Sequence, residues 1–301
     1  MSFLCFLGYI YNKLNQLTAC VGKKKEDLTM KRMFQGVMAA LVCGAALFTG
    51  CSSKDGEKTV FLDDYEKNIA NMVVGKWINV EDAGKAVSTD MKNVITIENF
   101  TKGYFSTSFG ETAWINREPF EIKFKRDTLS WIIPSDPALI YVEHVVNSVN
   151  ETEMNTTSRI VAKVGDQVVD EVGPMTMRYV KLAKDYRQDI IGLWEGKVTS
   201  DSSKFDDGEL HRWEYREDGT YVYYSMVDGN WIAVDQPLNQ YYVDGILLCT
   251  RWKNGEEAQE NREWWEIESI EDGVMKWKAL RLGDDGAPYA ASFSMTKVTE
   301  P

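Results

Sequence analysis

The sequence predicts an all-β protein made of two tandem antiparallel up-and-down β-barrels that follow an export signal. Three observations predict this fold class: an export-type N-terminal region that ends at a cysteine, an internal repeat, and apolar residues that alternate with polar ones between Asp-Gly and Asn-Gly turns. The chain of 301 residues is long enough for two domains that each bury a core.

The export signal is predicted at residues 30–50. Met30-Lys31-Arg32 supplies a basic start, residues 33–48 form a short apolar stretch, and small residues precede Cys51. This order is typical of a secretory signal and is too short for a comfortable membrane span. Because such signals begin at the N-terminus, we expect Met30 rather than Met1 to be the true start and residues 1–29 to be a mis-called upstream extension.

The end of this signal resembles a lipobox, in which small residues precede an obligatory cysteine. The resemblance implies cleavage before Cys51, lipidation of Cys51 and attachment to a membrane, with residues 51–63 as a flexible tether. Residues 54–57 also resemble the lysine-plus-acid signal of surface-exposed lipoproteins of the Bacteroidetes. The implied location is the cell envelope, in the outer membrane; whether the protein faces the periplasm or the surface stays open.

Two segments of the chain repeat one pattern. Gly75-Lys76-Trp77 and Gly192-Leu193-Trp194 each follow two β-branched residues and an upstream Asp-Tyr pair, and residues 175–182 resemble residues 293–298. Internal similarity of this kind indicates duplicated units. We therefore expect two domains of one type, residues 64–183 and 184–301, with a boundary near Lys184.

Both units show the period-two pattern of strands. Phe120, Ile122 and Phe124 alternate with charged residues, as do Trp213 and Tyr215. Six Asp-Gly or Asn-Gly turns, including the one at residues 284–286, divide the second unit into about eight strands. A meander of that length avoids exposed edges most simply by closing into a barrel, although a β-sandwich is compatible with the same strands.

The repeated Gly-x-Trp motif resembles the start of the first strand in lipocalins. The resemblance covers roughly residues 64–299 and implies two lipocalin-like domains in which Trp77 and Trp194 close one end of each barrel. It also implies a basic residue packed over each tryptophan. Arg178 is the expected partner of Trp77, whereas the aligned position in the second unit falls near Ser294, which is not basic.

Charge and cysteine content narrow the functional classes. The formal net charge of −12 disfavours binding to phosphate backbones, so no nucleic-acid partner is expected. Only Cys51 and Cys249 would remain after processing, so no disulfide framework is expected within one chain. Cys249 lies in an apolar run and is expected to be a buried, inert thiol.

The sequence offers little catalytic chemistry, and we expect neither an enzyme nor a cofactor. The only histidines, His144 and His211, lie in different units without partners at metal-ligand spacing, so no metal site is expected. Glu263, Glu266 and Glu268 could form an acid/base pair, but Glu266 and Glu268 alternate with an isoleucine and are expected to face solvent.

Aromatic residues are the unusual feature, because seven of the ten tryptophans lie in the second unit. Strand parity directs six aromatic side chains into one interior: Trp213, Tyr215, Tyr221, Tyr223, Trp265 and Trp277. These rings either fill the barrel as a packed core or line a cavity for an amphipathic ligand such as a lipid or a glycan.

Two functional hypotheses follow. The first is a membrane-anchored, non-catalytic protein that binds a small hydrophobic or amphipathic ligand in the second barrel. The alternative is an envelope protein with filled barrels that acts in protein–protein interaction or as a structural lipoprotein. A cavity would favour the first, whereas exposed Trp231, Trp252 or Trp264 clustered on one face would favour the second. The oligomeric state and the ligand stay open.

Overall fold

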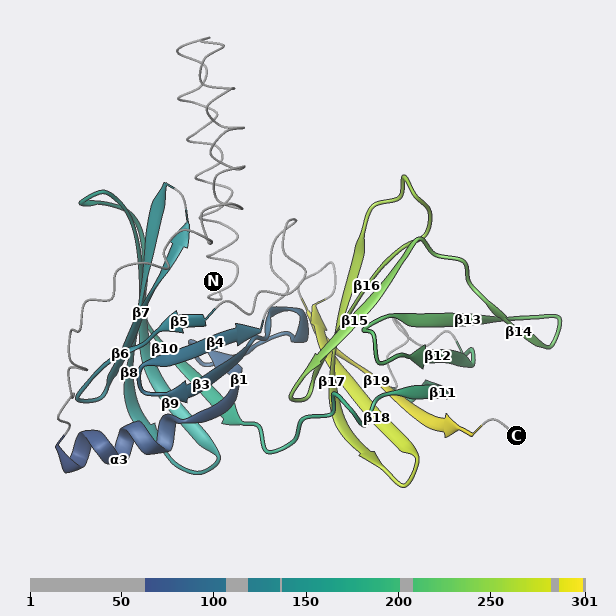
Figure 1. Cartoon of the computed structure of the whole chain (residues 1–301), viewed down its shortest axis with the longest axis horizontal. Coiled ribbons are helices and arrows are strands. Elements are labelled where there is room, and N and C mark those ends of the chain that lie inside the picture. Colours follow the sequence, from purple (N-terminus) through teal and green to yellow (C-terminus); the bar gives the residue numbers. More distant parts are fainter. Residues whose placement is uncertain (1–62, 107–118, 136, 201–207, 283–286, 300–301) are drawn as a thin grey trace, which may run out of the picture.

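The computed structural model describes residues 63–106, 119–135, 137–200, 208–282 and 287–299. The described chain is almost entirely antiparallel β-structure and forms two tandem β-barrel domains, side by side in Figure 1. The predicted signal peptide, the lipidation site Cys51, the tether and the turn at residues 284–286 lie outside the described residues.

The first domain contains one helix and a 10-stranded sheet among its described residues. The sheet follows the order β5-β4-β3-β1-β10-β9-β8-β7-β6, and β2 pairs with β1. Its elements are α3 (Asp64–Val73), β1 (Gly75–Asp82), β2 (Lys85–Ala86), the 3-10 helix η2 (Thr89–Met91), β3 (Val94–Asn99), β4 (Lys102–Ser106), β5 (Pro119–Glu121), β6 (Lys123–Lys125), β7 (Thr128–Ser135), β8 (Ala138–Val149), β9 (Glu153–Val164) and β10 (Gln167–Lys181).

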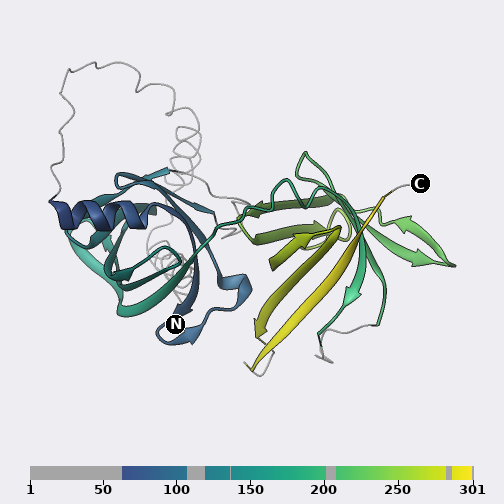
Figure 2. The ribbon, with the colours of Figure 1, turned by 90° about the horizontal axis from the view of Figure 1, so that it is seen from below.

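The ends of this sheet meet within one bent segment. Phe120 pairs with β4, whereas Phe124 pairs with β7. Between them lies buried Ile122, whose N–H donates to the carbonyl of Thr101 at 2.8 Å. The strand predicted around these three residues is therefore two short strands, and the bend closes the sheet on itself, as the view in Figure 2 shows.

The helix α3 covers the closed end of the first barrel. Asp63 and Glu66 form a capping box at its start. Its buried face includes Ile69 and Val73, which join the barrel core. The Trp77 indole N–H donates to the carbonyl of Val73 at 2.8 Å, so the tryptophan satisfies an otherwise open carbonyl at the helix end.

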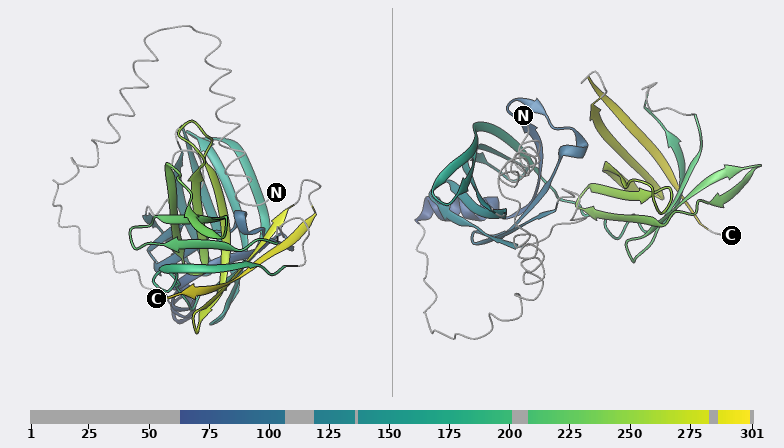
Figure 3. Two further views of the ribbon diagram at one scale, coloured as in Figure 1. Left: turned by 90° about the vertical axis from the view of Figure 1, so that its right-hand side faces the viewer. Right: turned by 90° about the horizontal axis from the view of Figure 1, so that it is seen from above.

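The second domain is a 9-stranded sheet in the order β14-β13-β12-β11-β19-β18-β17-β16-β15, counted within the described residues. Its strands are β11 (Gly192–Val198), β12 (His211–Tyr215), β13 (Tyr221–Val227), β14 (Asn230–Ala233), β15 (Leu238–Asp244), β16 (Leu247–Lys253), β17 (Asn261–Glu271), β18 (Val274–Leu282) and β19 (Pro288–Val298). Each domain is thus one continuous curled sheet, not the two facing sheets of a sandwich (Figure 3).

The second barrel is closed less completely than the first. Thr220, directly before β13, forms an isolated bridge with Gln240 of β15. Beyond it the tip of the β13–β14 hairpin projects away from the body of the barrel (Figure 1). The Asp228-Gly229 turn of this hairpin has positive φ at both residues, the conformation expected of an Asp-Gly hairpin.

Matching contacts surround the repeated tryptophans. Trp77 and Trp194 are both fully buried, and the Trp194 indole donates to the carbonyl of Ile190 at 2.7 Å. The ammonium of Lys181 lies 5.1 Å from the ring centroid of Trp77, and that of Lys297 lies 5.2 Å from that of Trp194. Each tryptophan thus sits between a main-chain acceptor and a cation.

The expectation that Arg178 covers Trp77 is therefore wrong. Arg178 forms ion pairs with Glu81 and Glu153, because it alternates with inward-facing Met177 and Tyr179 and so points outward. Lys181 has the inward parity and is the direct cross-strand neighbour of Trp77. In the second domain Lys297 takes the same position opposite Trp194.

The glycine of each motif permits this arrangement. Gly75 has φ of +139° and Gly192 has φ of +132°, which side-chain-bearing residues rarely adopt. A Cβ at these positions would lie 2.5 and 2.7 Å from the Cε atoms of Lys181 and Lys297. The glycine therefore adopts a conformation that would strain other residues and leaves room for the lysine that crosses it.

Apolar residues of the two barrels form one shared cluster. Ile78 and Val94 of the first barrel pack with Tyr242, Leu247 and Cys249 of the second. Cys249 is fully buried in this cluster, as the sequence predicted.

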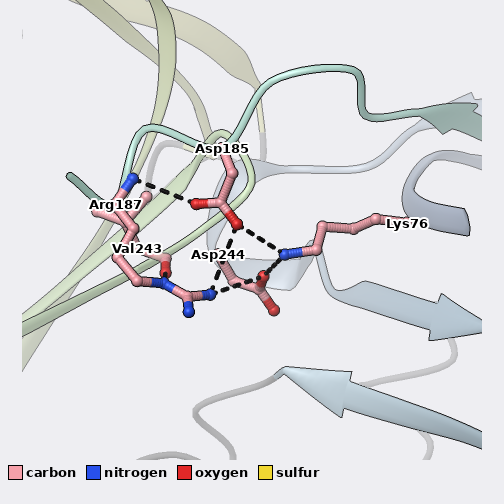
Figure 4. A network of polar contacts seen from close by, with 5 residues as sticks. All are labelled: Lys76, Asp185, Arg187, Val243 and Asp244. Carbon is pink, nitrogen blue, oxygen red and sulfur yellow. Dashed lines mark hydrogen bonds and ion pairs between the residues drawn. The ribbon is translucent and has the colours of Figure 1, made fainter. Parts of the chain in front are cut away.

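Polar contacts beside this cluster fix the orientation of the domains. The ammonium of Lys76 contacts Asp185 at 3.0 Å and also buried Asp244, and the guanidinium of Arg187 approaches both carboxylates (Figure 4). Burial would raise the pKa of Asp185, but its hydrogen bond and proximity to Lys76 outweigh burial and lower that pKa.

A second polar contact corrects a prediction from the sequence. Glu266 is 7% exposed and does not face solvent. It accepts hydrogen bonds from Lys92 at 2.7 Å and from the Thr89 hydroxyl at 2.8 Å, both in the first domain. Its side chain does point out of the second barrel, but the first barrel covers that face. Glu268 is exposed, as expected.

Candidate functional site

The second barrel contains a cavity of about 390 Å³. All six aromatic residues that strand parity directs inward line it: Trp213, Tyr215, Tyr221, Tyr223, Trp265 and Trp277. They come from β12, β13, β17 and β18, so the cavity wall spans strands on both sides of the barrel. The rings line a space and do not fill the barrel completely.

Trp277 is at the centre of the aromatic cluster. Its ring stacks on Trp265 at 5.5 Å between centroids, and it meets Trp213 at 5.7 Å and Tyr215 at 6.4 Å with interplanar angles of 79° and 84°. Edge-to-face contacts of this kind are favourable between rings. These contacts also orient the ring faces in several directions around the cavity.

Eight further residues line the cavity and were not predicted from the sequence: His211, Val234, Gln236, Thr250, Trp252, Asn254, Glu263 and Phe293. Parity would have found His211, which alternates with Trp213 and stacks on it at 5.2 Å. It would also have found Glu263, two residues before Trp265. Gln236 and Asn254 come from connections outside the strands and are hydrogen-bonded to each other at 2.8 Å, which no strand pattern could predict.

The cavity wall carries polar groups between the rings. The Tyr223 hydroxyl lies 3.4 Å from Nδ1 of His211. The Tyr215 and Tyr221 hydroxyls have pKa values raised first by burial, with a further contribution from the nearby Glu263 carboxylate. The Glu263 carboxylate in turn lies 3.3 Å from the guanidinium of Arg281.

One buried donor on this wall has no acceptor among the described residues. Trp277 is 2% exposed, and its indole N–H forms no hydrogen bond within the described part of the chain. A buried unsatisfied donor costs about 1–3 kcal/mol. By contrast, the two barrel-end tryptophans, Trp77 and Trp194, both donate to main-chain carbonyls. An acceptor on a bound molecule, or water in the cavity, would satisfy the Trp277 donor.

The first barrel contains a different polar cluster. His144 is buried, stacks on Trp131 at 4.8 Å and contacts the Ser158 hydroxyl through Nδ1. The Thr156 hydroxyl lies 2.9 Å from that of Ser158. Burial lowers the pKa of His144 from 6.5 to about 3, so the ring is neutral and part of the core.

The described residues of the two domains form no recognisable metal centre. Among the described residues no group of three or more His, Cys, Asp or Glu side chains is placed to hold an ion. The three glutamates that could supply an acid/base pair lie in different environments: Glu263 lines the cavity, Glu266 lies at the domain interface and Glu268 is exposed.

The three tryptophans proposed as a surface cluster are dispersed and half-buried. Trp252 lines the cavity, whereas Trp264 packs beside the interdomain cluster. The Trp231 ring lies beneath the guanidinium of Arg212, 4.5 Å from its centroid.

Comparisons with known proteins assign no family. The chain matches no protein-family model and no curated protein. Among solved structures, one match is a protein of unknown function from the DUF3598 family of Nostoc punctiforme PCC 73102. It has 10% sequence identity, a TM-score of 0.25, and coverage of 79% of this chain and 100% of that chain. At that TM-score the similarity supports no statement about function. A search of the described helices found none with the length and hydropathy of a membrane span.

Proposed function

We propose that this chain is a membrane-anchored, non-catalytic lipoprotein whose second barrel binds a small hydrophobic or amphipathic ligand. The observation that carries the proposal is the 390 Å³ cavity walled by aromatic rings and a few polar side chains. Small-molecule sites are typically concave, largely apolar and furnished with a small number of polar groups. The acceptor-less indole of Trp277 adds a specific reason for a polar atom inside.

The proposed membrane anchoring rests on the lipobox-like residues 49–51. Lipidation of Cys51 would place the barrels in the cell envelope, and the resemblance of the following residues to a Bacteroidetes export signal favours the outer membrane. We expect Cys51→Ala to abolish incorporation of radiolabelled palmitate and release the chain from membranes. Cys249→Ala is the matched control, because Cys249 is buried at the domain interface. Equal labelling of wild type and Cys51→Ala would refute lipidation at this residue.

The proposed ligand binding predicts a saturable change in tryptophan fluorescence when residues 52–301 are titrated with lipids and glycans. Trp213→Ala should weaken binding at least tenfold, because Trp213 lines the cavity and is only half-buried. Trp231→Ala is the matched control, since Trp231 lies in the same domain but does not line the cavity. Equal affinities of the two variants would place the site elsewhere.

One observation favours the alternative, a protein-interaction role. Val227 and Ile232, on one face of the β13–β14 hairpin, are 49% and 51% exposed, and Met226 on the other face is 47% exposed. Neighbouring exposed apolar side chains of this kind occur at protein contacts. The alternative predicts that no small molecule saturates the fluorescence of the chain, and that Ile232→Ser removes its function while Trp213→Ala does not.

A further inference from the structure

The charge distribution around the cavity narrows the class of ligand, if the proposed binding function holds. Glu263 is the one side chain with a formal charge at neutral pH among the described residues that line the cavity. No lysine or arginine is among those lining residues, so a carboxylate or phosphate inside would lack a cationic partner on the wall. Burial of an unpaired charge is costly, which disfavours anions such as fatty acids.

The aromatic rings favour the opposite charge. The face of an aromatic ring carries negative charge density and attracts cations, and the attraction is stronger where water is excluded. Trp213 and Trp277 meet at 79°, and Trp213 and Phe293 at 88°, so the rings turn edges and faces in different directions around the same space. A box of rings in several orientations with a carboxylate beside it is the arrangement that recognises quaternary ammonium groups.

Arg281 partly offsets the negative charge of Glu263 but is not among the described residues that line the cavity. Its guanidinium lies 3.3 Å from one carboxylate oxygen of Glu263 and 4.7 Å from the ring centroid of Trp265. Trp265 also stacks on Trp277, so Arg281, Trp265 and Trp277 form one series of contacts.

The protein as a whole adds a long-range bias in the same direction. The chain has a formal net charge of −12, and a net negative potential raises the local concentration of cations and lowers that of anions. We propose that the aromatic cavity of the second barrel binds an organic cation, a compact ammonium group with an apolar substituent, with the rings around the cation and Glu263 as its counter-charge.

Three probes of similar shape but different charge test this inference: choline, the neutral 3,3-dimethylbutan-1-ol and the anionic 3,3-dimethylbutanoate. Their dissociation constants would be measured on the full chain by NMR titration. We expect choline to bind at least tenfold more tightly than the alcohol, and the carboxylate to bind most weakly. The advantage of choline should shrink as salt is raised, because dissolved ions screen the charge of the partly exposed Glu263 carboxylate.

Two substitutions should change choline affinity in opposite directions. Glu263→Gln should weaken binding about tenfold, whereas Arg281→Gln should strengthen it by removing a competing cation beside Glu263. Glu268→Gln is the matched control, because Glu268 lies on the same strand, is exposed and pairs with Lys278. Thermal melts of each variant separate an effect on binding from an effect on folding.

The outcomes distinguish this inference from the proposed function. Equal or tighter binding of the alcohol or the carboxylate, lost in Trp213→Ala, would overturn the choice of a cation and leave a binding cavity. Unchanged choline affinity in both Glu263→Gln and Arg281→Gln would also overturn it. If none of the probes and none of the lipids or glycans binds, both the cation inference and the binding function fail.

Discussion

Replacing Trp194 by alanine should destabilise the second barrel by about 3–5 kcal/mol, the range for removing a fully buried large aromatic side chain. Trp194 is fully buried, donates its indole N–H to the carbonyl of Ile190 and lies beneath the ammonium of Lys297. The substitution removes all three contributions at once and leaves a void beneath the segment that enters β11. Chemical denaturation followed by circular dichroism measures the change.

Two further substitutions test whether Trp194 closes the end of its barrel. Trp77→Ala should cost a similar amount, because Trp77 makes the corresponding contacts with Val73 and Lys181. Trp231→Ala should cost at most about 1 kcal/mol, since Trp231 is half-buried and its main contact is with Arg212. A cost for Trp194→Ala as small as that for Trp231→Ala would show that the barrel end does not depend on this ring.

Acidification should destabilise the first barrel through His144. Burial lowers the pKa of His144 from 6.5 to about 3, so between these pH values the unfolded chain binds a proton that the folded chain does not. The stabilising contribution is complete above pH 6.5 and is lost as pH falls towards 3. The difference between the two pKa values corresponds to at most about 5 kcal/mol.

The His144→Gln variant isolates this contribution. The free energy of unfolding would be measured for both proteins between pH 7 and pH 4, so that other titrating groups cancel in the difference. The wild type should lose stability relative to the variant as pH falls, because glutamine has no proton to gain. A difference that stays constant over this range would show that burial does not suppress protonation of His144.

Strand parity explains why much of the site could be predicted from the sequence. Side chains alternate across a strand, so the spacing of Trp213 and Tyr215 was enough to place both on one face. The same rule, applied fully, would have added His211 and Glu263. Lys181 has the same inward parity as Met177 and Tyr179, so strand alternation favours Lys181 over Arg178 as the partner of Trp77.

Other features depend on contacts that no local pattern records. Parity correctly directs Glu266 out of the second barrel, but only the packing of the domains shows that Lys92 and Thr89 meet it there. The bend at Ile122 that closes the first sheet depends on pairing with strands distant in sequence. The second barrel is closed incompletely, by the bridge between Thr220 and Gln240. This incomplete closure depends on where the β13–β14 hairpin separates from β15.

The indole resonance of Trp277 provides the most direct test that the second barrel holds a ligand. Its N–H is buried on the cavity wall without an acceptor in the described protein, whereas those of Trp77 and Trp194 are hydrogen-bonded to carbonyls. The resonance can be assigned with Trp277→Phe in ¹H–¹⁵N spectra. Addition of a ligand should shift the Trp277 signal with saturation and leave those of Trp77 and Trp194 in place. Fluorescence changes in the full lipid, glycan and cation series without any movement of the Trp277 signal would contradict a ligand in this cavity.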